Sequence, residues 1–406
     1  MPYTPSPEVL ERYADVLVNF ALGGGAGISP GEVVRISSSE SGKPLYAALH
    51  RAVWRAGGHT ISHYDADDDA ALNLAREFYE LASDAQVDYF AADYWRGLID
   101  QVDHNVSVIA DADPHALEGV EPGLLMRTGL AMKPFIEWRV EKENAHRFSW
   151  TLGLYGTPAM AAEAGLTEEE YWEQIIGACF LDDPDPIARW REVATQITDT
   201  ITWLDGLEIE RVHVKGEDVD LRLTLGERRT WVGGSGRNIP SFEIFTSPDW
   251  RGTEGWIAFN QPLYRYGNLV RGIRLEFADG RVVKASAEQN EHLLTQMVAT
   301  EGADKVGEFS LTDRRFSRIT KFMAHTLYDE NVGGPFGNTH IALGKSYHDA
   351  YAGDPDGVEA SEWERLGFND STVHTDMVST SDRVVTATLR DGSERVIYAG
   401  GEFQRD

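Results

Sequence analysis

Residues 33–64 read VVRISSSESGKPLYAALHRAVWRAGGHTISHY and decide the fold of the N-terminal half. They open with an apolar stretch, Val33 to Ile36, and close with a β-rich stretch, His59 to Tyr64. Between the two, apolar residues recur at helical spacing from Leu45 to Ala56, and Gly57-Gly58 ends that pattern. This order of strand, helix and strand predicts a β-α-β unit, the building block of parallel sheets.

The same alternation continues on both sides of this unit. Ser6 and Pro7 are suited to begin a helix in which apolar side chains recur from Val9 to Phe20. Further helices are predicted near residues 70–82, 95–101, 167–180 and 186–204, with an apolar strand at 106–110. We therefore expect an α/β N-terminal domain, residues 1–205, with an open, largely parallel sheet and a helical extension.

The pattern of apolar residues changes from helical to strand-like near Gly206. From Val219 to Leu225, apolar residues alternate with polar ones, as in a strand with one buried face. Two hairpins are predicted, one turning at Asp279-Gly280 and one at Asp391-Gly392, with a helix near residues 288–299. We expect a second domain, residues 206–406, that is mainly antiparallel β (α+β).

Composition narrows the classes of function. The formal net charge of -29 would repel phosphate backbones and anionic lipids, so neither nucleic acid nor a membrane is an expected partner. The excess of Asp and Glu that produces this charge also supplies carboxylates, the ligands that hard divalent cations require. Residues 1–20 do not resemble an export signal. Cys179 is the single cysteine, which excludes an internal disulfide and fits a reducing compartment, so we expect a cytoplasmic protein.

Three motifs with catalytic associations are better explained by structure. The Gly-rich stretch 23–27 leaves a helix and enters a strand, the reverse of the order that a dinucleotide loop needs. Cys179 belongs to an apolar helical pattern, so we expect it to pack in a core instead of acting as a nucleophile. Ser235 lacks the Gly-x-Ser-x-Gly pattern of a serine nucleophile.

Acidic and histidine residues inside apolar, strand-like segments of the C-terminal half are better candidates. Glu243 in IPSFEIFTSP and Glu308 in VGEFSL are carboxylates among apolar side chains, where an ionised group needs a partner such as a cation. His340 begins the segment HIALG, and His374 and Asp376 stand two apart, on one face of a strand. Each residue alone is compatible with a surface carboxylate or a core histidine. As a set without cysteine they suit Zn, Co, Mn or Mg, and the excess of carboxylates favours two metals.

These segments, together with GISPGEVVRI at residues 27–36, resemble the thermophilic aminopeptidase family, also called aminopeptidase T, aminopeptidase S or aminopeptidase II. The resemblance covers essentially the whole chain, and the order of the segments agrees. It implies metal ligands at Glu243, Glu308, His340, His374 and Asp376, with Glu330 of LYDENV as a further ligand. It also implies that Tyr347 and Glu308 are catalytic and that the protein is a homodimer.

One difference from the family lies between Glu330 and His340, where this chain inserts GGPFG at residues 333–337. We expect this insertion to reshape the wall of the substrate cleft.

The resemblance implies a metal-dependent aminopeptidase that releases N-terminal amino acids from peptides. Two divalent cations about 3.5–4 Å apart would share Glu308 and activate a water molecule, and the Tyr347 hydroxyl would stabilise the oxyanion. Two alternatives stay open: a ring-cleaving dioxygenase with a single iron on a related fold, and a peptide-binding homologue without catalytic activity.

Overall fold

The computed structural model describes residues 3–67, 72–265 and 268–405, and the chain forms two compact units. The first contains residues 1–191 and 235–239, and the second contains residues 192–234 and 240–406. The domain boundary expected after residue 205 stays a prediction. It lies at the end of helix α10 (Pro186–Gly206), whereas the division between the compact units falls inside this helix.

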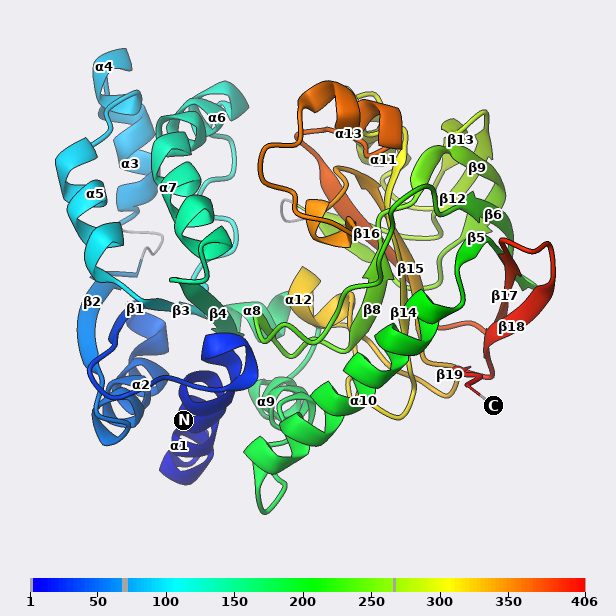
Figure 1. Ribbon diagram of the computed structural model, residues 1–406. Helices are drawn as coiled ribbons and strands as arrows, with labels where there is room; N and C mark the ends of the chain where they lie inside the picture. Colours follow the sequence, from blue (N-terminus) through cyan, green and yellow to red (C-terminus); the bar gives the residue numbers. More distant parts are fainter. Residues whose placement is uncertain (1–2, 68–71, 266–267, 406) are drawn as a thin grey trace. The chain divides into compact units, whose positions relative to one another are not determined.

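A parallel sheet forms the centre of the first unit (Figure 1). Among the described residues it has five strands, in the order β2 (His59–Asp65), β1 (Val33–Ser39), β3 (His104–Ile109), β4 (Ser149–Leu154) and β7 (Asn238–Ile239). All of the pairings are parallel. Helix α2 (Lys43–Arg55) connects β1 to β2, which confirms the predicted β-α-β unit and the α/β class of this half.

The helices of the first unit follow the predicted pattern in part. They are α1 (Pro7–Val16), the π-turn η1 (Leu17–Ala21), the 3₁₀ turn η2 (Leu22–Gly25), η3 (Glu40–Gly42), α2, α3 (Leu74–Leu81), α4 (Asp84–Val87), α5 (Ala92–Gln101), α6 (Pro122–Ala131), α7 (Lys133–Asn144), α8 (Pro158–Glu163) and α9 (Glu168–Ala178). The Ser6 side chain accepts a hydrogen bond from the Val9 N–H, which confirms the predicted start of α1. Residues 70 and 71 of the helix predicted near 70–82 lie outside the described residues, and α3 covers most of the rest.

Strand β4 and helices α6 and α7 were not predicted from the sequence. In α7 the apolar residues do not gather on one face, so the periodic signal on which helix prediction depends is absent.

The second unit is mainly antiparallel β, as predicted. In the described part of the chain its large sheet has eight strands, in the order β13 (Arg281–Ser286), β12 (Arg274–Ala278), β9 (Asp249–Ala258), β6 (Val219–Thr224), β5 (Ile209–Gly216), β17 (Arg383–Leu389), β18 (Glu394–Ala399) and β19 (Glu402–Phe403). A smaller sheet has the order β16 (His374–Ser379), β15 (Asn338–Gly344), β14 (Val306–Thr312) and β8 (Glu243–Thr246). The remaining elements are the pair β10 (Leu263–Arg265) and β11 (Asn268–Val270), helices α11 (Glu291–Val298), α12 (Thr326–Asp329) and α13 (Ala360–Leu366), and η4 (His348–Ala350).

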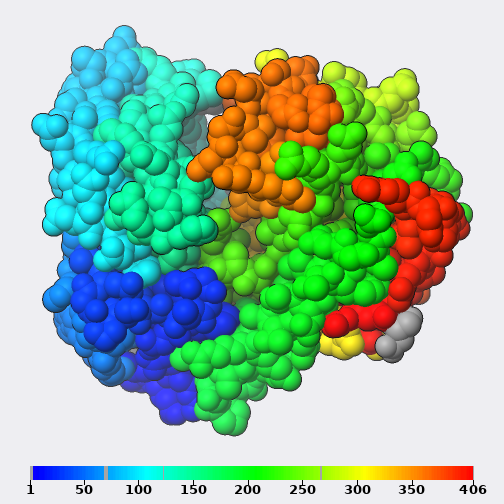
Figure 2. Space-filling model, viewed as in Figure 1, coloured from blue at the N-terminus to red at the C-terminus, as the bar shows by residue number. Residues whose placement is uncertain are grey.

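Both predicted hairpins are present in the large sheet. Strands β12 and β13 pair around Asp279 and Gly280, whose φ angles are 52° and 77°. Two consecutive positive φ angles are typical of the type I′ turn that Asp-Gly favours. The hairpin of β17 and β18 turns near Gly392 and forms part of the surface, coloured red in Figure 2.

The four-stranded sheet has an apolar face and a polar face. All seven residues of β14 and all seven of β15 are buried. One face, here called the core face, carries Ile244, Phe309, Leu311, Ile341, Leu343 and Met377, all of them buried. Because side chains alternate along a strand, the intervening residues point to the opposite face, here called the site face. Burial of the core face fixes the register, and with it the set of residues that the site face presents.

Over residues 3–67, 72–265 and 268–405, none of the helices combines the length and the apolar character that crossing a bilayer requires.

Candidate metal centre

Four neighbouring strands bring five of the six predicted ligands to the site face, and the sixth, Glu330, directly follows helix α12. Glu243 begins β8, Glu308 lies in β14, and His340 lies in β15. His374 and Asp376 both lie on β16, opposite Gly344 and Ala342 of β15. These two partners are small, as is Ser310, which pairs with His340. The small side chains leave room for the longer acidic and imidazole groups to converge above the sheet.

A β-bulge at Gly307 turns Glu308 onto the site face. Val306 pairs with Leu343 and Glu308 pairs with the next residue, Ala342, so Gly307 is an extra residue in β14. Without the bulge, Val306 and Glu308 would share one face of the strand. With it, Val306 joins the core face and Glu308 joins the ligands. A Cβ atom at position 307 would lie 2.3 Å from the Lys345 carbonyl oxygen, so only glycine fits.

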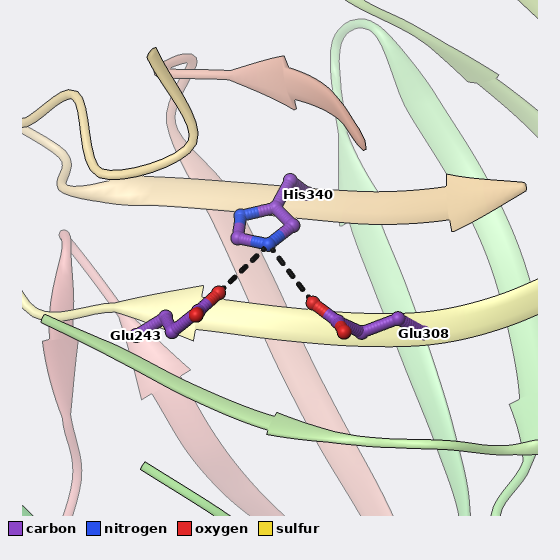
Figure 3. A group of neighbouring side chains, drawn as sticks. All are labelled: Glu243, Glu308 and His340. Carbon is purple, nitrogen blue, oxygen red and sulfur yellow. Dashed lines mark hydrogen bonds and ion pairs between the residues drawn. The ribbon is translucent and has the colours of Figure 1, made fainter. Parts of the chain in front are cut away.

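Glu243, Glu308 and His340 form the first group of potential ligands (Figure 3). The His340 ring extends from β15 toward both carboxylates, and its Nε2 lies 3.3 Å from a carboxylate oxygen of each glutamate. The side chain of His340 is fully buried, and that of Glu308 is 4% exposed. Nitrogen and oxygen donors at this separation fit around one divalent cation.

Glu308, His374 and Asp376 form a second group of three. The Nε2 atom of His374 lies 3.5 Å from Asp376 Oδ1 and 3.7 Å from Glu308 Oε2. In each group the ligand atoms all lie within 4.8 Å of one another. Glu308 is common to both groups, with Oε1 directed to His340 and Oε2 directed to His374. Its carboxylate therefore lies between two adjacent sets of donors.

The electrostatics of the site show an excess of negative charge. Burial raises the pKa of Glu308 to about 7, the hydrogen bond from His340 opposes this, and the charge on Glu243 adds to it. Burial disfavours a charged imidazole, but the contacts with Glu243 and Glu308 raise the pKa of His340 well above its usual value. Burial also opposes ionisation of Asp376, yet the charge of His374 holds its pKa below the usual value.

Glu330 and Tyr347 lie beside the two groups of ligands. Burial, followed by the charges of Glu243 and Asp376, raises the pKa of Glu330 well above its usual value. A cavity of about 20 Å³, room for about one water molecule, adjoins Glu330 and Asp376. The Tyr347 ring lies 4.6 Å from the His374 ring, centroid to centroid. Burial and the nearby carboxylates, Glu308 foremost, raise the pKa of the Tyr347 hydroxyl, so it stays protonated near neutral pH.

Several residues that were not predicted support these side chains. His374 Nδ1 donates to the Lys345 carbonyl at 2.8 Å, and the Tyr347 backbone N–H donates to Ser247 Oγ at 2.9 Å. Asn338 Oδ1 lies 3.1 Å from His340 Nδ1. Asn338 and His340 stand two apart on one strand, the same spacing that identified His374 and Asp376. A search for polar pairs at that spacing would have found Asn338.

The donor set fits divalent cations. Four carboxylates, those of Glu243, Glu308, Glu330 and Asp376, gather around two imidazoles, and burial makes each unpaired charge costly. Cations held by these oxygens and nitrogens would offset that cost, and the set without cysteine matches the ligands that Zn, Co, Mn and Mg accept.

A family model described as thermophilic metalloprotease (M29) matches residues 7–403. The chain belongs to this family. Aminopeptidase T from Thermus thermophilus is 28% identical to this M29 metalloprotease over 417 residues, which cover 98% of this chain and 99% of the relative. The solved structure of wild-type AmpT from the same organism superimposes with a TM-score of 0.81 at 25% identity, covering 97% of this chain and 98% of that chain. The family resemblance and the two-part fold predicted from the sequence are thus confirmed.

A second solved structure shares the fold alone. It is a 2,5-dihydroxypyridine dioxygenase from Pseudomonas putida, with a TM-score of 0.53 and 12% identity over 99% of this chain and 98% of that chain.

Proposed function

We propose that this M29 metalloprotease removes N-terminal amino acids from peptides and does so with two divalent cations. The enzyme prediction, a metallo-aminopeptidase, is confirmed by the family and by relatives named aminopeptidases. The number of cations is the finer proposal, and one observation carries it: Glu308 is shared by two groups of three ligands. Glu243, Glu308 and His340 would hold one cation, and Glu308, His374 and Asp376 would hold the other, with Glu330 as a further ligand.

The side chains around this site have distinct roles in the proposed reaction. When bound, the two cations would supply Lewis acidity and lower the pKa of the attacking water, so that it can give up a proton near neutral pH. The Tyr347 hydroxyl donates a hydrogen bond to the peptide oxygen that becomes negative. It can do so because its pKa is raised and its proton is retained. A carboxylate of the cluster passes the proton of the attacking water to the leaving amine.

Two further attributes belong to this proposal. Peptides with a free N-terminus are the proposed substrates, and Zn, Co, Mn or Mg the proposed cations. The proposed cytoplasmic location is supported by Cys179, the single cysteine of the sequence, because one cysteine excludes an internal disulfide and fits a reducing compartment.

A pair of substrates tests the assignment. Purified protein supplied with each of the four cations in turn should hydrolyse leucyl-p-nitroanilide or a similar aminoacyl anilide. It should not hydrolyse the N-acetylated substrate, because an aminopeptidase needs the free amine for placement. Equal rates on both substrates would reject an aminopeptidase.

Metal content per chain separates the two-cation site from the dioxygenase alternative, which uses one iron. Bound metal without hydrolysis of any aminoacyl anilide would favour the peptide-binding alternative.

A further inference from the structure

The side chain of Asn338 contacts two of the proposed ligand residues at once. Asn338 is the first residue of β15 and is 1% exposed. Its Nδ2 donates to the carbonyl oxygens of Glu330 at 2.7 Å and Val332 at 2.9 Å. Its Oδ1 lies 3.1 Å from Nδ1 of His340. One amide therefore joins the backbone at Glu330 to the imidazole of His340.

These contacts determine the orientation of the amide and the tautomer of the histidine. A carbonyl oxygen only accepts hydrogen bonds, so the amide atom that faces Glu330 O and Val332 O must be the NH₂ group. The other amide atom is then Oδ1, which also only accepts, so the hydrogen of neutral His340 must lie on Nδ1. In the neutral form that binds a cation, the lone pair therefore lies on Nε2, the atom that faces Glu243 and Glu308.

The same amide closes residues 333–337, the segment that the family resemblance identifies as an insertion. Residues 333–337 lie between the carbonyl groups that accept from Asn338 and Asn338 itself. The insertion is held separately on its other side, where the Tyr398 hydroxyl lies within hydrogen-bond distance of two carbonyl oxygens, Phe336 O at 3.0 Å and Thr312 O at 2.8 Å. Two buried polar side chains thus hold this loop, but only Asn338 touches a proposed ligand side chain.

We infer that Asn338 is a positioning residue of the metal centre. It fixes His340 with Nε2 free to bind a cation and keeps Glu330 at the site despite the five inserted residues. Partners that hold the second nitrogen of a metal-binding histidine typically affect metal affinity about 10–100-fold when they are removed. The inference rests on the proposed metal centre and adds a residue that the family resemblance did not supply.

Zinc affinity, measured by competition with a chromogenic chelator, tests this role without depending on activity. Asn338→Ala removes both functions of the amide and should weaken zinc binding about 10–100-fold. Asn338→Asp keeps an acceptor for His340 but loses the donors to Glu330 and Val332, so its affinity should lie between those of Asn338→Ala and wild type. Tyr398→Phe is the matched control, because it removes one polar contact with the inserted loop without touching a ligand. It should lower the unfolding temperature of the metal-free protein and leave zinc affinity within about two-fold of wild type.

The order of affinities decides the outcome. If Asn338→Ala binds zinc as tightly as Tyr398→Phe, Asn338 only stabilises the fold and the inference is wrong. If Asn338→Ala does not fold, the comparison of Asn338→Asp with Tyr398→Phe applies, and equal affinities would again reject it. If the wild-type protein binds no zinc, the metal centre itself is refuted and the inference falls with it.

Discussion

Glu308 is the residue on which the two-cation proposal depends most directly. Replacing it with Gln keeps size and shape but removes the charge that lets one side chain serve two cations. We expect Glu308→Gln to lower metal content from near two per chain to one or none. Activity should fall by more than the about 10–100-fold that loss of an outer partner causes. Mass spectrometry of bound metal, together with rate measurements, checks this.

Glu276→Gln is a suitable control for that variant. Glu276 is a partly exposed carboxylate on β12 that pairs with Arg274 and Lys284 at the surface. Its replacement should change neither metal content nor rate, because exposed pairs of this kind contribute about 0–1 kcal/mol to stability. If Glu308→Gln behaves like Glu276→Gln, Glu308 is an ordinary carboxylate and the site proposal is wrong.

Tyr347 can be tested separately from metal binding. Tyr347→Phe keeps the ring that contacts His374 and Phe245 but removes the hydroxyl. If the hydroxyl stabilises the oxyanion, kcat should fall about 10²–10³-fold with little change in KM or metal content. Tyr351→Phe alters a tyrosine that packs against Trp363 and should leave kcat unchanged. An unchanged kcat in Tyr347→Phe would limit Tyr347 to packing.

The β-bulge of β14 positions a ligand at the level of a whole strand. In Gly307→Ala, the new methyl group would meet the backbone carbonyls of Lys345 and Gly344 at 2.3 and 2.4 Å, which side-chain movement cannot relieve. Lys345 O is also the acceptor for His374, and Glu308, which directly follows Gly307, belongs to both groups of ligands. Both groups should therefore be disturbed. We expect a loss of about 3 kcal/mol in unfolding free energy and weaker zinc binding.

Gly97→Ala shows what the same substitution does where space is available. Gly97 lies inside α5, and a Cβ atom there would meet nothing within 4 Å. Alanine should therefore raise the unfolding free energy by up to about 1 kcal/mol. Denaturant titration of both variants gives the comparison, and equal effects would contradict the role assigned to the bulge.

The elements that were predicted from the sequence are those whose signals are local. The Asp279-Gly280 hairpin and the placement of His374 and Asp376 on one strand follow from turn chemistry and from the two-residue period. The bulge at Gly307 could not be predicted, because it exists only relative to the partner strand β15. Convergence of the ligands depends on the register of four strands that are distant in sequence. No local pattern gives this register, so the grouping of the ligands could be predicted only from the family resemblance.

At the scale of the whole molecule, acid should weaken the second unit through Asp218 and Arg383. The Arg383 side chain is fully buried and lies 3.0 Å from Asp218. Burial opposes ionisation of Asp218, but Arg383 holds its pKa below the usual value. A lowered pKa means that this pair stabilises the fold above about pH 4, the unfolded value. That contribution is lost as the pH falls through the lower folded value.

Asp218→Asn should remove this part of the pH dependence. At neutral pH it should cost about 3–5 kcal/mol, because Arg383 stays buried without its partner. Asp218 lies in the turn between β5 and β6, and Asp220 is a more exposed carboxylate on β6, so Asp220→Asn should cost at most about 1 kcal/mol. Thermal unfolding between pH 3 and pH 7 distinguishes the two variants. Similar losses of stability in both would show that the Asp218–Arg383 pair contributes no more than an exposed ion pair.

We propose, on family resemblance, that two copies of the chain associate. A homodimer of a 45.2 kDa chain should scatter light as a particle of about 90 kDa. Because each copy carries a formal charge of -29, moderate salt should favour association by screening the repulsion. A mass near that of one chain at micromolar concentration, with and without salt, would reject the dimer.

Strand β7 has a consequence for how the chain is made. It completes the parallel sheet of the first unit by pairing with β4, through Leu152 with Asn238 and Gly153 with Ile239. Yet it is encoded after β5 and β6, which belong to the other unit. During synthesis, the β4 edge of the N-terminal sheet therefore stays unpaired until residue 239 has emerged from the ribosome. A fragment ending at residue 205 would keep that edge open permanently and should aggregate during expression.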